Sequence, residues 1–226
     1  MQNQNRTDLR INGLGNASGG SFNFVQINGK GDINGDIDCI DLQINGLGCM
    51  NGNVKAESIR VAGKSEIAGN LNAQELIIDG MMDIHGGIVA QSIENRGMLK
   101  VNKDCGSEIF KSKGGLTING LLNAGKINIE VYAPCKIKEI GGENIEIRFG
   151  SAFGLRKFID SIFPGWARGL SAETIEGDII YIEGTTAKVV RGKDVEIGPG
   201  CAIDIVEYKN AFKNSGDSKV KQSKKI

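Results

Sequence analysis

The stretch "IRVAGKSEIAGN", residues 59–70, holds the same small unit twice: an aliphatic residue, one small residue and then glycine. Only small or polar residues separate the two copies. The unit suits the end of a short strand, because the aliphatic side chain is buried while glycine accepts a corner where two backbones come close together. The stretch therefore predicts short strands joined by tight corners.

The unit recurs at a fixed distance along the chain. Equal steps of 17 in residue number connect one apolar column, which contains Ile33, Met50, Ile67, Ile84, Val101, Ile118 and Cys135. Two further columns with the same step begin at Ile27 and Leu42, and a glycine column runs through Gly29, Gly46, Gly63, Gly80 and Gly97. Self-similarity at a fixed period is the signature of a repeat architecture. We therefore expect one structural unit per period, each stacked on the next.

Each unit reads as about three short strands. Apolar residues alternate over short runs such as "NLNAQELIIDG", residues 70–80, and glycine ends the runs. At about 3.3 Å per strand residue, one unit travels once around a small coil and stacks its aliphatic residues on those of the previous coil. The predicted fold is all-β: a parallel β-helix, or β-solenoid, with about 17 residues per rung and rungs about 4.8 Å apart.

Composition narrows the range of functions. The 27 Lys and Arg residues balance the 27 Asp and Glu residues, so no global field steers the chain onto nucleic acid, and we expect no nucleic-acid partner. No stretch approaches the roughly 18 apolar residues of a spanning helix, so we expect a cytoplasmic protein. The five cysteines are odd in number and form no C-x-x-C pair, which predicts free thiols.

The candidates for chemistry are weak. The only histidine, His85, shares an outward column with Asn34, Asn51 and Asn102, so we expect it to face solvent. The glycine-rich segments "GKGDING" and "GLGCMNG" are corners of the repeat, and neither leads into a helix as a phosphate-binding loop does. We therefore predict a protein that is not an enzyme, with no catalytic, cofactor or metal site and no small-molecule substrate.

The chain divides into five segments. A polar leader occupies residues 1–8, the β-helix core residues 9–148, and an aromatic-rich insertion residues 149–172. Further β-helix rungs are predicted for residues 173–208, where Ile197 follows Ile180 by the same step of 17. Residues 209–226 are rich in lysine, serine and asparagine and are expected to form a disordered basic tail.

The insertion is predicted to contain a short amphipathic helix that ends at Pro164 and Gly165, because its apolar residues follow a spacing of three and four. Two roles stay open. The helix lies on the solenoid flank or covers an open end, or it docks onto a membrane surface or a partner protein. The residues assigned to docking are Phe153, Phe158, Ile162, Phe163 and Trp166.

Self-assembly follows from the repeat. A terminal rung without a cap presents unpaired N–H and C=O groups beside an apolar face. We therefore predict that the chain associates with itself end to end, without nucleotide or metal. The residues expected at the first end are Ile11, Phe22, Phe24 and Val25, and those at the other end are Ile203, Ile205, Tyr208 and Phe212.

The repeated register, as in residues 61–76, together with the polar leader and the basic tail, resembles the bactofilins, a family of polymer-forming bacterial cytoskeletal proteins. The resemblance covers roughly residues 9–140. It implies a right-handed β-helix that forms nucleotide-independent filaments, and a scaffold for cell-shape, envelope or motility factors at the inner face of the membrane. The insertion and the rungs after it depart from the family pattern. If they cap one end, closed dimers replace filaments.

Two other functions remain open. A non-polymerising adaptor, similar to the β-helical domain of the division-site regulator MinC, would bind partners on its flank. A hexapeptide-repeat acyltransferase has some likeness to "EIGPGCAI", residues 196–203. Such an enzyme would show aliphatic residues every six positions, whereas the steps from Ile33 to Met50 are 4, 5, 2 and 6.

Overall fold

The computed structural model of the chain describes residues 6–150 and 169–226. These residues form two compact units, Met1–Ser107 (unit 1) and Glu108–Ile226 (unit 2). All of the regular structure in the described residues is β-strand, and the strands pair in parallel within each unit. The predicted all-β parallel β-solenoid is therefore confirmed for both units.

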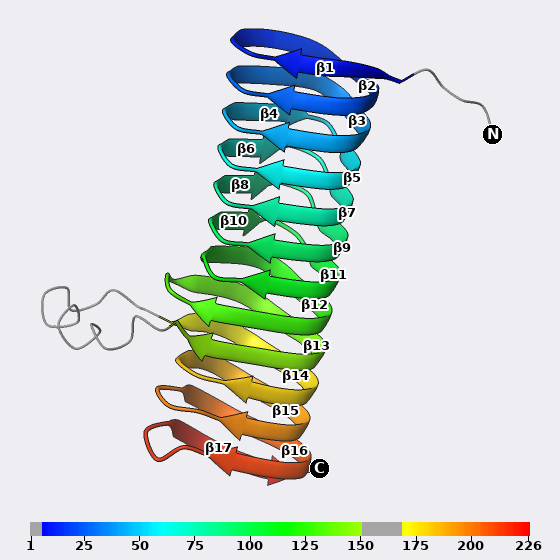
Figure 1. Cartoon of the computed structure of the whole chain (residues 1–226). Helices are drawn as coiled ribbons and strands as arrows, with labels where there is room; N and C mark the ends of the chain where they lie inside the picture. Colours follow the sequence, from blue (N-terminus) through cyan, green and yellow to red (C-terminus); the bar gives the residue numbers. More distant parts are fainter. Residues whose placement is uncertain (1–5, 151–168) are drawn as a thin grey trace, which may run out of the picture. The chain divides into compact units, whose positions relative to one another are not determined.

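Unit 1 is built from short strands that each pair with the strand one turn further along (Figure 1). Its strands are β1 (Thr7–Ile11), β2 (Leu14–Ile27), β3 (Lys30–Ile44), β4 (Leu47–Asn51), β5 (Val54–Val61), β6 (Lys64–Ile67), β7 (Leu71–Ile78), β8 (Met81–Ile84), β9 (Ile88–Asn95) and β10 (Met98–Val101), while β11 (Cys105–Ser112) contains the boundary between the units.

The register of unit 1 has the predicted period. Ile44 pairs with Val61, and Val61 with Ile78, so each turn advances the residue number by 17. The first turn is shorter by one, since Ile11 pairs with Ile27. Inward columns of isoleucine, valine and leucine are fully buried, whereas the alternate positions face outward, because successive side chains of a strand point to opposite faces.

Unit 2 has longer strands and an uneven period. Its strands are β12 (Gly115–Val131), β13 (Cys135–Phe149), β14 (Leu170–Ile182), β15 (Thr185–Ile197), β16 (Ala202–Asn214) and β17 (Lys219–Lys225). Ile129 pairs with Ile147 after a step of 18, Ile147 with Ile182 after 35, and Ile182 with Ile197 after 15. The step of 35 contains residues 151–168, and without that segment it equals one ordinary turn of 17.

Two predicted alignments in unit 2 are wrong. Cys135 pairs with Leu116 rather than with Ile118, and Ile180 pairs with Val195 rather than with Ile197. The strands stay in register by hydrogen bonding, but the corners between them differ in length. A fixed step of 17 therefore loses the register after the first long corner.

The predicted segment boundaries also need correction. The helix predicted in the insertion falls on residues 151–168, outside the described residues, and no described residue is helical. The predicted insertion, residues 149–172, is too long at both ends, because Phe149 ends β13 and β14 begins at Leu170. The predicted disordered tail is wrong for residues 209–214 and 219–225, because β16 continues to Asn214 and β17 pairs with it.

Candidate assembly surfaces

The N-terminal edge of unit 1 is only half covered. β1 pairs with residues 22–27 of β2, and no described strand pairs with residues 14–20 on that side. We call residues 14–20 the open half-turn; their sequence, LGNASGG, carries no charge. Ala17 continues the inward column of Ile33 and Met50, and Leu14 is 87% exposed. An uncharged strand edge with small side chains is the kind of surface onto which another strand adds.

The residues predicted for this end are only partly exposed. Ile11 is 7% exposed and Val25 is fully buried, so their predicted exposure is wrong. β1 begins at Thr7, inside the predicted polar leader, and covers the end of β2. Phe22 and Phe24 are half-buried, and the Arg10 guanidinium carbon lies 5.2 Å from the centre of the Phe24 ring.

The C-terminal edge of unit 2 is rich in lysine. β17 pairs with residues 202–208 and leaves residues 211–214 of β16 without a described partner strand on that side. It contributes Lys219, Lys221, Lys224 and Lys225. Among the described residues, only Lys221 of these four forms an ion pair, with Asp204 at 2.7 Å. Lysine on an edge strand opposes pairing with another edge, because a new strand would bring these charges close together or bury them.

The residues predicted for this second end also divide into two groups. Ile203 is 1% exposed because β17 covers it, so its predicted exposure is wrong. Ile205, Tyr208 and Phe212 are half-buried. The rings of Tyr208 and Phe212 lie 5.5 Å apart, and Phe212 belongs to the part of β16 that β17 does not reach.

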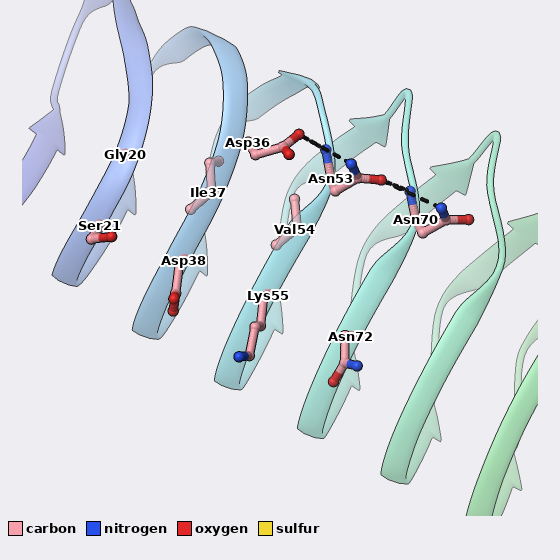
Figure 2. A pocket seen from close by; sticks show the side chains of 10 residues that line it. All are labelled: Gly20, Ser21, Asp36, Ile37, Asp38, Asn53, Val54, Lys55, Asn70 and Asn72. Carbon is pink, nitrogen blue, oxygen red and sulfur yellow. Dashed lines mark hydrogen bonds between the residues drawn. The ribbon is translucent and has the colours of Figure 1, made fainter.

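A shallow groove of about 590 Å³ runs along one corner of unit 1 (Figure 2). Asp36 Oδ1 accepts hydrogen bonds from the backbone N–H of Asn53 at 2.7 Å and from its side-chain amide at 3.1 Å. Asn53 Oδ1 accepts the N–H of Asn70 at 2.9 Å, and Asn70 Oδ1 accepts that of Gly87 at 2.9 Å. The bonds from Asn53 hold the pKa of the Asp36 carboxyl below its usual range. The ladder thus ties successive corners together.

Four of the five cysteines are poor nucleophiles. All five are unpaired, as predicted, and four are buried. Burial raises the pKa of the Cys39 and Cys105 thiols to about 12 and that of the Cys135 and Cys201 thiols to about 11. Because the thiolate is the reactive form, these four side chains are inert near neutral pH.

The remaining predictions concern His85, metal binding, membrane-spanning helices and the docking residues. His85 lies on the surface, as predicted, with its Nε2 at 3.3 Å from Oε1 of Glu66. In residues 6–150 and 169–226, no group of three or more histidine, cysteine, aspartate or glutamate side chains is arranged to hold a metal ion. No helix among these residues is long and apolar enough to cross a membrane. The predicted docking residues Phe153, Phe158, Ile162, Phe163 and Trp166 lie outside the described residues.

Parallel turns and buried aliphatic columns define a β-solenoid protein. Residues 3–89 match the family model described as "Bactofilin: Polymer-forming cytoskeletal". Over these residues the chain is similar to the bactofilins, which confirms the resemblance seen in its repeat. The description names a structural cytoskeletal family and no catalytic activity.

Two curated proteins of Bacillus subtilis (strain 168) resemble this chain. The first, "Uncharacterized protein YhbF", is 38% identical over 109 residues, which cover 47% of this chain and 42% of the relative. The second, "Uncharacterized protein YhbE", is 37% identical over 112 residues, which cover 48% and 44%. The alignments thus span less than half of the length of these relatives. No solved structure matches the chain.

Proposed function

We propose that this chain is a self-assembling scaffold whose copies join end to end through the N-terminal edge of unit 1, without nucleotide or metal. The observation that carries the proposal is the open half-turn, residues 14–20, which is uncharged and has no described partner strand on one side. The family description, polymer-forming cytoskeletal, supports the same function.

The energetic reason is the incomplete pairing of β2. Inner strands such as β5 pair with a strand on each side, β3 and β7. Among the described strands, residues 14–20 have such a partner on one side only, in β3. A second copy that adds a strand here forms backbone hydrogen bonds worth about 0.5–1.5 kcal/mol each and buries the inward side chain of Ala17. The contact needs no cofactor, because all of its partners are protein groups.

The lysine-rich edge of unit 2 favours a second candidate, a closed dimer that acts as an adaptor. Lys219, Lys224 and Lys225 would meet like charges if two such edges approached, and this repulsion weakens as salt screens it. Dimers at low salt and longer assemblies at higher salt follow from that repulsion. In either form, the scaffold role in positioning cell-shape, envelope or motility factors beside the membrane is carried over from the bactofilin family.

The test places one charge inside or outside the open half-turn. Ala17→Lys puts an ammonium group in the inward column, whereas Ser18→Lys, the matched control, puts it in the outward column of Asn34. Burying an unpaired charge is costly, so we expect Ala17→Lys to raise the concentration needed for assembly at least about tenfold. Sedimentation velocity and negative-stain electron microscopy without nucleotide give the readout.

Filaments of the wild-type chain that Ser18→Lys keeps and Ala17→Lys dissolves support the polymer. Dimers with the same sensitivity support the adaptor. A wild-type chain that stays monomeric at every concentration, or an Ala17→Lys chain that assembles normally, contradicts the edge contact. Circular dichroism confirms that both variants keep their β-structure.

A further inference from the structure

One flank of unit 1 carries a regular stripe of apolar and basic side chains. The register aligns one outward residue from each of six turns: Leu14, Lys30, Leu47, Lys64, Met81 and Met98. Four of the six large apolar side chains exposed in unit 1 belong to this column, with exposed fractions of 87% for Leu14, 48% for Leu47, 41% for Met81 and 55% for Met98. We call it the first column. Figure 1 shows β4, β6, β8 and β10, which carry most of it, following one another along the unit.

A second column lies beside the first, two residues further along each strand. Its members are Asn16, Asp32, Cys49, Glu66, Asp83 and Lys100. Residues two apart on a strand point to the same side, so each turn presents one member of each column on this flank. The turn with Lys30 therefore also presents Asp32, and the turn with Lys64 presents Glu66.

The charges of these two turns are not paired with each other. Residues two apart along a strand can form an ion pair, as Arg96 and Glu94 do at 3.5 Å, but Lys30 forms none with Asp32 and Lys64 none with Glu66. Among the described residues, no ion pair involves Lys30, Lys64 or Asp32. Asp32 forms a hydrogen bond with the Cys49 side chain, and Glu66 lies 3.3 Å from His85. By contrast, Lys100 reaches Asp83 of the preceding turn at 2.8 Å. Two lysines thus form no ion pair within their own chain, and the two carboxylates form none with a lysine or arginine.

We propose that this flank joins two copies of the chain side by side, running in the same direction. A two-fold axis parallel to the direction in which the turns stack places the first column of one copy against the second column of the other, turn by turn. Lys30 then faces Asp32 of the second copy, and Lys64 faces its Glu66. Leu47 packs against Cys49 of the second copy between these charge pairs.

An antiparallel pair does not give this match. A two-fold axis across the stack, placed between the turns of Leu47 and Lys64, sets each column against itself in reverse. Asp32 then meets Asp83, Lys30 meets Met81, and no lysine faces a carboxylate. Like charges disfavour this antiparallel arrangement, and opposite charges favour the parallel one, so the pattern selects the parallel pair.

The contact between two single chains is small. Six turns about 4.8 Å apart give a flank roughly 29 Å long, and its two columns are only about 6.6 Å apart. The area of this narrow flank is well below the usual interface of about 800 Å² per partner. A weak contact of this kind is transient in free chains. It accumulates where chains are already joined end to end, and this last step rests on the proposed function.

Disulfide trapping captures a transient contact and tests its direction. Cys49 is the one cysteine of the five that is not buried. In Leu47→Cys, the new thiol faces Cys49 of the second copy, and an added copper–phenanthroline oxidant removes two electrons while two protons leave as the S–S bond forms. We expect linked dimers. Val89→Cys is the matched control, because Val89 is exposed on β9, outside both columns. We expect it to give few linked dimers.

Charge reversal tests the proposed pairs. In the Leu47→Cys background, Lys64→Glu places carboxylates against Glu66 of the second copy, and Glu66→Lys places ammonium groups against its Lys64. Either change alone lowers the yield of linked dimer by about fivefold or more. Mixing the two variants in equal amounts restores opposite charges on facing turns and restores the yield.

The outcomes separate this inference from the end-to-end proposal. Trapping is repeated with Ala17→Lys chains, whose open half-turn is blocked, so a failure of end-to-end assembly leaves the flank test intact. Equal yields from Leu47→Cys and Val89→Cys overturn the inference. So do single charge reversals without effect, or a mixture that does not recover. Linked dimers that persist when Cys49→Ser is added to Leu47→Cys show that the first column meets itself, which overturns the parallel arrangement.

Discussion

One corner of unit 2, at Gly184 and Gly200, is built differently from the glycine corners of unit 1. In unit 1, the corners are stacked glycines: a Cβ built on Gly46 or Gly63 would lie 2.0 Å from the carbonyl oxygen of the glycine one turn earlier. In unit 2, the ring of Phe149 lies over Gly184 and Gly200, whose φ angles of 55° and 75° are in the left-handed region. A side chain at Gly184 would collide with that ring at 2.0 Å.

The two units also differ in the period of their turns. Backbones that touch at a corner require each turn to return to the same place. Unit 1 keeps steps of 16 or 17 from Leu9 onward. In unit 2 an aromatic ring fills one corner, and the steps range from 15 to 19, apart from the turn with residues 151–168. The strict period of unit 1 thus accompanies the close packing of its glycine corners.

The largest expected effect breaks the glycine stack. Gly63→Ala adds a methyl group where the nearest atom is the Gly46 carbonyl oxygen, and backbone must move to admit it. We expect a loss of about 3 kcal/mol, near the upper end for single substitutions. Urea unfolding followed by circular dichroism, below the assembly concentration, measures it.

Gly13→Ala is the matched control for this substitution. Gly13 lies in the same column one turn before Gly29, but a Cβ built on it meets no atom within 4 Å. The methyl group should therefore leave the urea midpoint nearly unchanged. Similar losses for Gly13→Ala and Gly63→Ala would show that close packing is not the reason for glycine in this column.

The second effect removes the aromatic cover in unit 2. Phe149→Ala exposes the corner at Gly184 and Gly200, and we expect a loss of about 2 kcal/mol because the ring is only half-buried. Labelling of the buried Cys201 thiol, next to Gly200, should speed up. Phe149→Leu, which keeps much of the apolar volume, should lose less. If Cys201 is labelled at the wild-type rate in Phe149→Ala, the ring does not hold this corner.

The smallest effect concerns the polar side of the same corner. The Tyr181 hydroxyl donates a hydrogen bond to Glu183 at 2.5 Å, and the Arg148 guanidinium carbon lies 4.2 Å from the Tyr181 ring centre. The bond to Glu183, together with partial burial, raises the pKa of Tyr181 to about 12. A raised pKa means that the stabilisation is complete below the unfolded value of about 10 and is lost as the pH rises toward 12.

Tyrosinate absorbance measures this titration, and its loss in Tyr181→Phe identifies the signal. Glu183→Gln removes the charged acceptor and should bring the Tyr181 titration back toward its ordinary pH. A Tyr181 that ionises at the same pH in Glu183→Gln would show that Glu183 is not the cause of the shift.

Sequence reasoning succeeded where packing enforces repetition. The columns through Ile27, Ile44 and Val61 were predicted and are confirmed, because every turn of unit 1 uses the same inward positions. It failed at Ile180 and Ile197, because the step of 15 in that turn depends on how Gly184 and Phe149 pack. The prediction for the tail was wrong because its composition is typical of disorder. In the structure, β17 pairs along the backbone of residues 202–208 in β16.

The assembly surfaces show the same division. The repeat pattern predicted uncapped ends and placed Phe22 and Phe212 there, and both residues are half-buried. The pattern did not predict the burial of Ile11 and Val25 or the importance of Ala17. They depend on how far β1 extends over β2, which is a property of the three-dimensional pairing.

The sequence by itself determined the parallel β-solenoid, its period of 17 in unit 1 and its resemblance to the bactofilins. Aliphatic residues recur wherever a side chain is buried, and glycines recur wherever two backbones touch. Only the tertiary structure decided which half-turn stays open, where lysine covers an edge, and which outward columns share a flank. Those features arise from strand register and corner length. Both are set by hydrogen bonds between turns, which join residues too far apart in the sequence for a local pattern to reveal.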